Sequence, residues 1–265
     1  MRKDCCEGRF LITFDDGPHA NTVPILEQLA HNPVQQGIKA MFFVQTRNAE
    51  GGRPQFGSFL LQREHAEGHA LGLHTGTAGH VSHTSLSQIE LERSLRRGMD
   101  DIQLITHERT MFVRPPYWRF NAATQAEYRR QGLYMMLSDA KAYDGVDWGQ
   151  HIFRRMNFRS QLHGIWRRMR RCDIPEIDGI VPIVVTFHDT NQYTAAHLIE
   201  YLDLLIDEAE RINLPISRKM FYDSATEIVQ AALRRTVGHA ETAGTNTWCG
   251  EVLSHVRTNR AGTDC

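Results

Sequence analysis

The sequence contains no uninterrupted apolar run approaching the roughly 20 residues that a membrane-spanning helix needs. Cysteine is also scarce: five are scattered over 265 residues, four of them near the two ends, and none forms a CxxC pair. Such a set indicates neither a disulfide framework nor a cysteine-ligated structural zinc. The formal net charge is only −1, so charge gives no reason to expect nucleic acid as a partner.

The first residues of the chain lack the apolar segment of a secretory signal. We therefore expect a cytoplasmic protein unless a leader has been trimmed from the sequence, and for that reason the compartment stays open. The sequence contains no feature that decides the oligomeric state.

The chain does have an apolar content of 41%, arranged in runs that alternate with helical patterns. We expect strands at residues 9–13, 39–44, 70–73, 111–113, 134–137 and 180–187, with a short one near 221. We expect helices at residues 22–31, 59–67, 87–105, 122–131, 194–212 and 224–235. Strands alternating with helices predict an α/β fold with a parallel sheet. Residues 8–236 would form this single domain, and residues 237–265 a loose C-terminal tail.

Polar side chains stand where five of the predicted strands end. They are Asp15 with Asp16, His74, Arg114, Asp139 and His188. Because the carboxyl ends of parallel strands meet at one edge of a sheet, reactive groups gather there. The sequence therefore predicts a reactive site at this edge.

A basic segment at residues 150–171 departs from the alternation and contains seven arginines. We interpret it as the solvated face of an inserted helix. The alternative is a rim that attracts an anionic ligand.

The adjacent carboxylates of Asp15 and Asp16 follow the first strand, and Gly17-Pro18 favours a turn there. Two neighbouring carboxylates repel unless a cation or a proton separates them. A site can use this conflict if one acid binds a metal and the other accepts a proton from water. The alternative is a surface turn with two solvated acids.

Three histidines follow the strand at 70–73: His74, His80 and His83. Two imidazoles and one carboxylate are a common ligand set for a divalent ion that keeps an open position for water. Asp16, His74 and His80 supply that set.

Short motifs make the chain resemble the polysaccharide deacetylase family, the NodB-like enzymes of carbohydrate esterase family 4. Five stand in the family's order: T-F-D-D-G-P at 13–18, the His74-Thr75 start of H-[ST]-x-x-H, R-P-P-Y at 114–117, D-x-x-D-W at 144–148, and a strand ending in His188-Asp189 with Thr194 beyond it. The resemblance covers about residues 10–205. It implies a single distorted (β/α) barrel of about seven strands.

The second motif departs from the family because Ala78 stands where the second histidine belongs. Counting back from the helix start at Ser87 places that histidine at His80, after a two-residue insertion. His83 is the alternative ligand.

The fourth and fifth motifs also depart. The fourth has two registers: by pattern it is residues 144–148, and by distance from the preceding strand its acids are Asp139 and Asp144, with Gly145 replacing the tryptophan. In the fifth, Thr186 stands where the family usually has a leucine that lines the pocket for the acetyl methyl group, which leaves the acyl group open.

The resemblance implies roles for the metal site and the base. Asp16, His74 and His80 would hold a divalent metal ion, for which zinc is expected; the ligand types equally permit cobalt, nickel or manganese. Asp15 would be the general base, and Arg114 would pair with it and orient it.

The resemblance also implies an acid and a substrate surface. His188 would protonate the departing amine, held charged by Asp144, with Asp147 or Asp139 as alternatives. The metal and the Tyr117 backbone N–H would stabilise the oxyanion. Trp148, with Trp118, would stack on sugar rings.

The implied function is metal-dependent removal of an N-acetyl group from an amino sugar in an N-acetylglucosamine-containing oligo- or polysaccharide. One alternative is a family relative that hydrolyses another non-peptide C–N bond, in a formamide, allantoin or a cyclic imide. The other is a carbohydrate-binding protein whose catalytic site has decayed.

Overall fold

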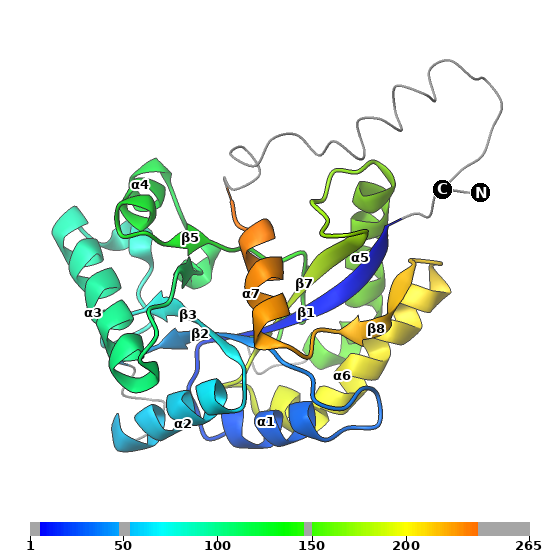
Figure 1. Cartoon of the computed structure of the whole chain (residues 1–265), viewed down its shortest axis with the longest axis horizontal. Helices are drawn as coiled ribbons and strands as arrows, with labels where there is room; N and C mark the ends of the chain where they lie inside the picture. The colour runs from blue at the N-terminus through cyan, green and yellow to red at the C-terminus, as the bar shows by residue number, and fades with distance from the viewer. Residues whose placement is uncertain (1–5, 48–53, 146–149, 238–265) are drawn as a thin grey trace, which may run out of the picture.

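A computed structural model describes residues 6–47, 54–145 and 150–237 and shows one curled parallel sheet in this part of the chain (Figure 1). Its strands are β1 Glu7–Asp15, β2 Met41–Gln45, β3 Ala70–Thr75, β4 Phe112–Val113, β5 Tyr134–Met135, β6 Ala140–Lys141, β7 Ile180–His188 and β8 Ile216–Phe221. Their order is β5-β4-β3-β2-β1-β7-β6, and β8 pairs with the start of β1. The two edges of this half-barrel are therefore β5 and β6. This arrangement confirms the predicted distorted (β/α) barrel.

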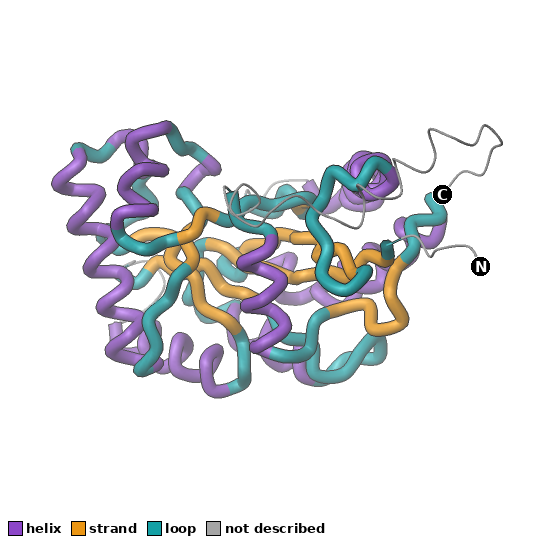
Figure 2. Tube along the Cα trace, turned by 45° about the horizontal axis from the view of Figure 1, so that its top comes forward, coloured by secondary structure: helices purple, strands orange, loops and turns teal. Residues whose placement is uncertain are grey.

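Helices surround the sheet, as Figure 2 shows in purple around the orange strands. They are α1 Thr22–Ala30, α2 Pro54–Ala66, α3 Gln88–Thr106, α4 Ala122–Arg130, α5 Arg154–Arg170, α6 Gln192–Arg211 and α7 Ala225–Arg234, with short 3-10 turns η1 His83–Ser85, η2 Pro116–Trp118 and η3 Gln150–Phe153. Helix α3 begins at a capping box, in which Ser87 and Glu90 each bind the other's backbone N–H.

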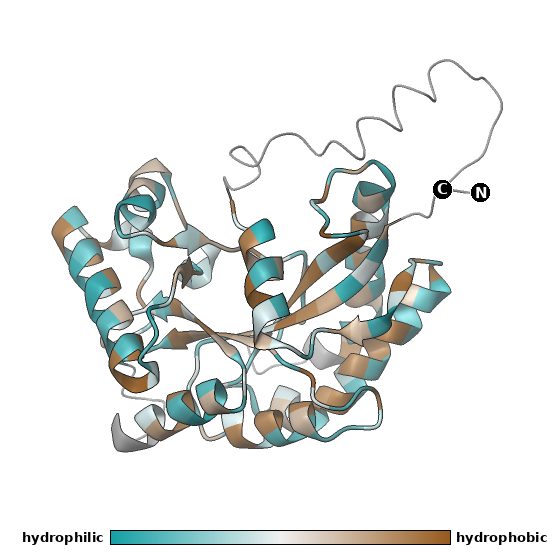
Figure 3. Ribbon diagram, viewed as in Figure 1, coloured by the Kyte–Doolittle hydropathy of each residue, from teal (hydrophilic) through white to brown (hydrophobic). Residues whose placement is uncertain are grey.

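Successive side chains of β1 point to opposite faces of the sheet and belong to two different apolar clusters. Ile12 and Phe14 pack with residues of α1, α3, α5 and α6 in the larger cluster, on the outside of the curl. Leu11 lies on the other face, packed with Ile228 of α7. Helix α7 lies in front of the sheet in Figure 1 and closes this inner face, and the strands between the layers are largely brown in Figure 3.

The inner face becomes polar towards the carboxyl ends of the strands. Thr13 of β1 is aligned with Thr186 of β7, and one pleat further on Asp15 is aligned with His188. Residues two apart in a strand point to the same side. The inner face therefore carries an apolar floor, then a layer of threonines, then the predicted catalytic groups.

Sequence reasoning missed β6 and predicted too long a strand at 134–137. Strand β5 ends at Met135. Further along the chain, Ala140–Lys141 forms β6, which pairs with β7. Residues 138–144 contain no apolar run that would predict a strand, so only the pairing with β7 defines β6. The predicted tail, from residue 238 on, lies outside the described residues.

The basic segment forms η3 and α5, and its arginines pair with acidic side chains of α6. Arg155 and Arg159 reach Glu208 at 2.7 and 2.5 Å, and Arg154 reaches Glu200 at 2.7 Å. Much of the positive charge is therefore neutralised by helix–helix contacts. In the part of the chain that the structure describes, no helix combines the length and apolar character needed to cross a bilayer.

Candidate active site

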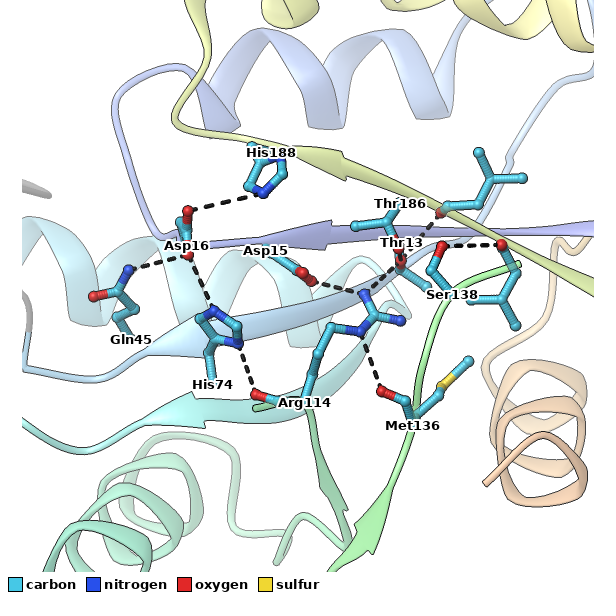
Figure 4. A network of polar contacts seen from close by, with 12 residues as sticks. Thr13, Asp15, Asp16, Gln45, His74, Arg114, Met136, Ser138, Thr186 and His188 are labelled. Atoms are coloured by element: carbon cyan, nitrogen blue, oxygen red, sulfur yellow. Dashed lines mark hydrogen bonds and ion pairs between the residues drawn. The ribbon is translucent and has the colours of Figure 1, made fainter. Parts of the chain in front are cut away.

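The two acids at the end of β1 point in different directions. Asp15 continues the pleat of the strand and is 2% exposed. Asp16 adopts the left-handed conformation, with φ 76°, which aspartate tolerates better than most residues. This single backbone change aims Asp15 at Arg114 and Asp16 at the histidines (Figure 4).

Arg114 is fully buried beneath the site. Its Nη1 donates to Asp15 Oδ1 at 2.7 Å and to Thr13 Oγ1 at 2.7 Å, and its guanidinium carbon lies 4.0 Å from the centre of the Phe43 ring. Burial lowers the pKa of Arg114, and the charge of Asp15 opposes this shift; an arginine keeps its proton in such a setting. The pair therefore fixes the Asp15 carboxylate in one position.

The threonine layer supports this ion pair from below. Thr13 Oγ1 lies 2.9 Å from Thr186 Oγ1 and 3.1 Å from the Val185 carbonyl oxygen. Thr186, which stands where the family usually has a leucine, is 1% exposed. Its hydroxyl is thus part of the network that reaches Asp15 through Thr13 and Arg114.

Asp16, His74 and His80 form a compact group of candidate metal ligands. Asp16 Oδ1 lies 3.1 Å from His74 Nε2 and 3.3 Å from His80 Nε2, and the two imidazole nitrogens are 3.1 Å apart. In the described residues this is the one cluster of three or more such donors within 4.8 Å of one another.

The hydrogen bonding of His74 shows that a cation fits this cluster. Its Nδ1 lies 2.8 Å from the Arg114 carbonyl oxygen, which can only accept, so Nδ1 carries the proton. In neutral His74 the Nε2 lone pair then faces the Asp16 carboxylate at 3.1 Å. Atoms of this kind approach so closely when a cation lies between them, and a histidine ligand is usually oriented by a bond of this kind to its other nitrogen.

The electrostatics of the cluster also suit a cation. Burial acts to raise the pKa of Asp16, but the imidazoles around it, His74 first and then His188 and His80, hold that pKa below its usual range. Burial lowers the pKa of His80, with Asp16 opposing. An ionised carboxylate beside a neutral imidazole is the state in which both bind a metal.

His83 lies apart from this cluster. It is completely buried, and its Nδ1 is 2.7 Å from the Tyr128 hydroxyl of α4. Burial, with the charges of His74 and His80 as smaller causes, lowers the pKa of His83 to about 3. The structure therefore brings His80, and not His83, to Asp16 and His74.

His188 pairs with Asp144 on the other side of Asp16. Its Nδ1 lies 2.8 Å from Asp144 Oδ1, its backbone N–H donates to Oδ2 at 3.0 Å, and its Nε2 lies 3.9 Å from Asp16 Oδ2. Thr194 also donates to Asp144, at 2.5 Å. Burial acts to lower the pKa of His188, but Asp144, followed by Asp15 and Asp16, raises it to about 9.

Asp139, predicted among the polar groups at the reactive edge, does not join the site. Its carboxylate accepts from the Val184 backbone N–H at 2.9 Å and pairs with Arg168 at 3.3 Å and with Arg235. Strand β5 ends at Met135, before it reaches Asp139. The Asp139 side chain therefore points away from the site, towards Arg168 of α5 and Arg235 after α7. Asp144 is the acid that meets His188, whereas Asp147 and Trp148 lie outside the described residues.

Gly145 stands where one register of the fourth motif has a tryptophan, and the structure supplies a reason. A Cβ atom at this position would lie 3.1 Å from Cε1 and 3.2 Å from Nε2 of His188. Side-chain atoms rarely pack so closely, so the glycine leaves the imidazole edge uncovered.

The R-P-P-Y segment leads into a tight turn beside His80. Tyr117 and Trp118 have φ angles of 58° and 60°, unusual for bulky residues and common at functional sites. The Tyr117 ring stacks on His80 at 4.3 Å, its hydroxyl donates to the His80 carbonyl at 2.9 Å, and it is 54% exposed. Tyr117 thus positions His80 and presents an aromatic face at the opening.

Sequence reasoning missed Gln45 and Asn191. Gln45 ends β2, is 3% exposed, and donates from Nε2 to Asp16 Oδ1 at 3.3 Å. Asn191 caps α6 through the Thr194 N–H and donates to the Asp144 carbonyl at 2.8 Å. The rule that polar groups gather at strand ends would have found Gln45, which follows the apolar run of β2.

Comparison with known proteins identifies similar sequences. A sequence model of a family described as polysaccharide deacetylase matches residues 2–136. A chitin deacetylase of Arthroderma benhamiae is 29% identical over 220 residues, which are 78% of this chain and 49% of the relative. The putative polysaccharide deacetylase YheN of Bacillus subtilis is 30% identical over 139 residues, 52% of this chain and 45% of the relative. The chain thus spans about half the length of these relatives.

Solved structures share the fold at lower identity. The chitin deacetylase of Colletotrichum lindemuthianum aligns with a TM-score of 0.60 and 20% identity, covering 80% of this chain and 86% of that one. A family 4 carbohydrate esterase from Streptomyces lividans aligns with a TM-score of 0.55 and 21% identity, covering 77% and 90%.

Proposed function

Because this chain belongs to the polysaccharide deacetylase family, we propose that it is a metal-dependent hydrolase that removes an N-acetyl group from an amino sugar of an oligo- or polysaccharide. One observation carries the proposal. Metal-ligating atoms of Asp16, His74 and His80 converge within 4.8 Å, while the neighbouring carboxylate of Asp15 is held separately by Arg114. The names of the chitin deacetylase relatives support N-acetylglucosamine as the sugar.

Asp16, His74 and His80 would hold the ion, for which we expect zinc, with cobalt, nickel or manganese accepted by the same ligands. When bound there, a divalent ion supplies Lewis acidity, which lowers the pKa of a water molecule and polarises the amide carbonyl. His74 is oriented for this role by the Arg114 carbonyl, and His80 by the stacked Tyr117 ring.

Asp15 would act as the general base. Its carboxylate accepts the proton that the attacking water loses, and general base catalysis of this kind contributes roughly 10²–10⁴-fold in rate. The bond from Arg114 occupies Oδ1, so Oδ2 is the oxygen that would take the proton. Arg114 also limits rotation of the carboxylate, which keeps the base in line for the attack.

His188 would act as the general acid. An amide nitrogen leaves only when protonated, and the imidazolium Nε2 faces the site while Nδ1 is bound to Asp144. The raised pKa of about 9 keeps His188 protonated at neutral pH. Asp144 is itself held by Thr194 and Asn191, so the acid is fixed on the side of the site opposite Arg114.

The turn at Tyr117 would bind substrate. Its backbone N–H belongs to η2, which follows Arg114 directly in the chain, and we assign it to the oxyanion that develops on the carbonyl oxygen. The exposed aromatic face of Tyr117 suits the apolar face of a pyranose ring. Trp148 stays a predicted second stacking surface.

Acetate release from N-acetylglucosamine oligomers tests the proposal. We expect release that stops when a chelator removes the ion and returns when zinc is added. Turnover confined to a formamide, allantoin or a cyclic imide would assign the chain to a relative with another C–N substrate. Oligomer binding without any hydrolysis would assign it to the decayed binding proteins.

A further inference from the structure

A cavity of about 290 Å³ lies at the amino ends of β3 and β4, and we call it the amino-end cavity. The end of α2, the end of α3, the loop from α3 to β4 and the start of α7 enclose it. Its lining includes His65, His69, Arg109, Thr110, Ala225 and Val229. Small-molecule sites have volumes of about 300–1,000 Å³, so this cavity has room for a small ligand.

The amino-end cavity is separate from the proposed active site. Ala70 and Leu71, at the start of β3, line it, whereas His74 lies near the other end of that strand. A strand rises about 3.3 Å per residue, which puts roughly 13 Å of β3 between Ala70 and His74. None of the proposed metal ligands lines the cavity. A ligand bound here would therefore not touch the metal.

His69 presents a buried hydrogen-bond donor in the wall of this cavity. The ring is 3% exposed, and its Nδ1 accepts the Ala40 backbone N–H at 3.0 Å. Burial, with the charges of Lys39 and Arg63 adding, lowers the pKa of His69 to about 3, so the imidazole is neutral at pH 7. A neutral imidazole that accepts at Nδ1 carries its proton on Nε2. Within residues 6–47, 54–145 and 150–237 no acceptor takes this proton.

The other buried side chains of the lining offer a ligand no further donor. Thr110 Oγ1 donates to the Leu71 carbonyl at 2.7 Å, and Thr106 Oγ1 donates to the Ile102 carbonyl at 2.9 Å. The side chains of Leu71, Ile102 and Phe112 are apolar and buried. A matching ligand therefore combines an apolar body with an acceptor for His69.

The charges at the cavity favour an anionic acceptor. Helix α7 starts at Ala225, which lines the cavity, and the Ser224 side chain does not cap this helix. The first N–H groups of a helix have no intrahelical partners and favour an anion. Arg109, which is exposed, and His65 add further donors to the lining. Glu108 also belongs to the lining and would repel a second negative charge, so the ligand is expected to carry one.

We propose that the amino-end cavity binds a small organic monocarboxylate with an apolar body, such as an aryl-substituted acid. Its carboxylate would accept from His69 Nε2, from the start of α7 and from Arg109. Its body would lie against Leu71, Ile102 and Phe112. This binding site goes beyond the proposed deacetylase activity and does not depend on it.

Calorimetric titration of the zinc-loaded protein with phenylacetate and with phenylacetamide tests the proposal. The amide has nearly the same shape and no negative charge. We expect phenylacetate to bind at least about tenfold more tightly, because hydrogen bonds to a charged acceptor are roughly twice as strong as neutral ones. No binding of phenylacetate, or equal affinities for the two compounds, would overturn the proposal.

Nuclear magnetic resonance of protein labelled with ¹⁵N-histidine locates the ligand. The Nε2 signal of His69, identified by its absence in His69→Asn, should shift when phenylacetate is added. A titration that shifts other histidines and leaves this signal unchanged would contradict the placement.

Two variants and a matched control test the lining. Arg109→Met removes the charge and keeps an unbranched stem, whereas Val229→Phe fills part of the cavity. Each should weaken phenylacetate binding about tenfold. Arg97→Met removes an arginine from the exposed part of α3 and should leave the affinity unchanged. Equal affinities in all three variants would overturn the proposal, and Arg109→Met decides alone if Val229→Phe does not fold.

The same titration of Asp16→Ala excludes the active site as the place of binding. Carboxylates also bind zinc, and we expect this variant to hold no metal. An affinity for phenylacetate equal to that of wild type supports the amino-end cavity. Loss of binding in Asp16→Ala would place the acid at the metal and overturn the proposal. Acetate release enters none of these measurements, so a failure of the deacetylase proposal would leave this inference decidable.

Discussion

Asp15 and Asp16 are neighbours in the chain and occupy opposite environments. Asp15 is 2% exposed and bound to a fully buried arginine. The Asp16 side chain is 19% exposed and faces imidazoles. The left-handed backbone at Asp16 produces this division, because continued strand geometry would instead have sent the second side chain into the outer core. One backbone angle thus separates a proposed base from a proposed metal ligand.

Asp16→Ala should have the largest effect, because it removes the only carboxylate of the ligand cluster. We expect loss of both the bound metal and acetate release, by several powers of ten in kcat/KM. Metal content per chain and acetate release measure the two losses. A variant that kept its metal and lost only turnover would show that Asp16 is not a metal ligand, and its role would then not differ from that of Asp15.

Asp15→Asn should abolish most turnover and leave the metal in place. The amide cannot accept the proton of water, so kcat should fall about 10²–10⁴-fold, while the ligand atoms of Asp16, His74 and His80 are unchanged. Metal content equal to that of wild type is the matched control. Near-normal kcat would show that the base is another group.

His80→Ala and His83→Ala compare a histidine of the proposed metal-ligand cluster with a histidine that is buried beside it. His80→Ala should weaken zinc binding strongly, because a ligand is lost. His83→Ala should retain metal and instead lower the free energy of unfolding, because the His83–Tyr128 bond is buried. Zinc titration with a competing chelator, alongside urea denaturation, distinguishes them, and the reverse pattern would make His83 the ligand.

Arg114→Met tests how much the buried ion pair with Asp15 contributes to the free energy of unfolding. Removing one partner of a buried ion pair costs about 3–5 kcal/mol, because the other charge stays buried. We expect a loss of this size in the free energy of unfolding, and a much smaller loss in a variant that also carries Asp15→Asn. Equal losses in the single and double variants would mean that Arg114 stabilises the fold without the help of Asp15.

The smallest effect should be the pH dependence of the free energy of unfolding that comes from His69, a buried histidine outside the metal-ligand cluster. His69 is 3% exposed and its Nδ1 accepts the Ala40 N–H at 3.0 Å. Burial, with the charges of Lys39 and Arg63 adding, lowers the pKa of His69 to about 3. As the pH falls below the usual histidine value, the unfolded chain takes up a proton that the folded chain refuses, so the free energy of unfolding falls by about 1.4 kcal/mol per pH unit.

His69→Asn keeps an acceptor for the Ala40 N–H and cannot be protonated. Urea denaturation of wild type and variant at pH 7.5, 6.5 and 5.5 should show the stability difference shrinking as the pH falls through this window. Parallel pH dependences would contradict the assignment of His69 as a neutral, buried acceptor.

Much of the architecture follows from the sequence, for identifiable reasons. Long strands such as β1 and β7 have continuous apolar runs, and α3 has a capping box, so their types and approximate positions were predictable. Strand β6 lies among polar residues and has no such run, which is why it was missed. Asp139 was misplaced for the same reason, since the early end of β5 turns it away from the site.

The sequence predicted which residues form the site better than it predicted how they are placed. Strand ends identified Asp15, Asp16, His74, Arg114 and His188, and the structure brings all five together. Counting back from Ser87 favoured His80 and left His83 as the alternative, because a loop of irregular length sets which imidazole returns to Asp16.

A crystal structure of the zinc-loaded protein, with anomalous scattering recorded at the zinc edge, tests the central claim most directly. The account predicts one strong peak coordinated by a carboxylate oxygen of Asp16 and by Nε2 of His74 and of His80, with Asp15 still bound to Arg114 and outside the coordination sphere. A peak ligated by Asp15 or His83, or none between Asp16 and His74, would contradict it.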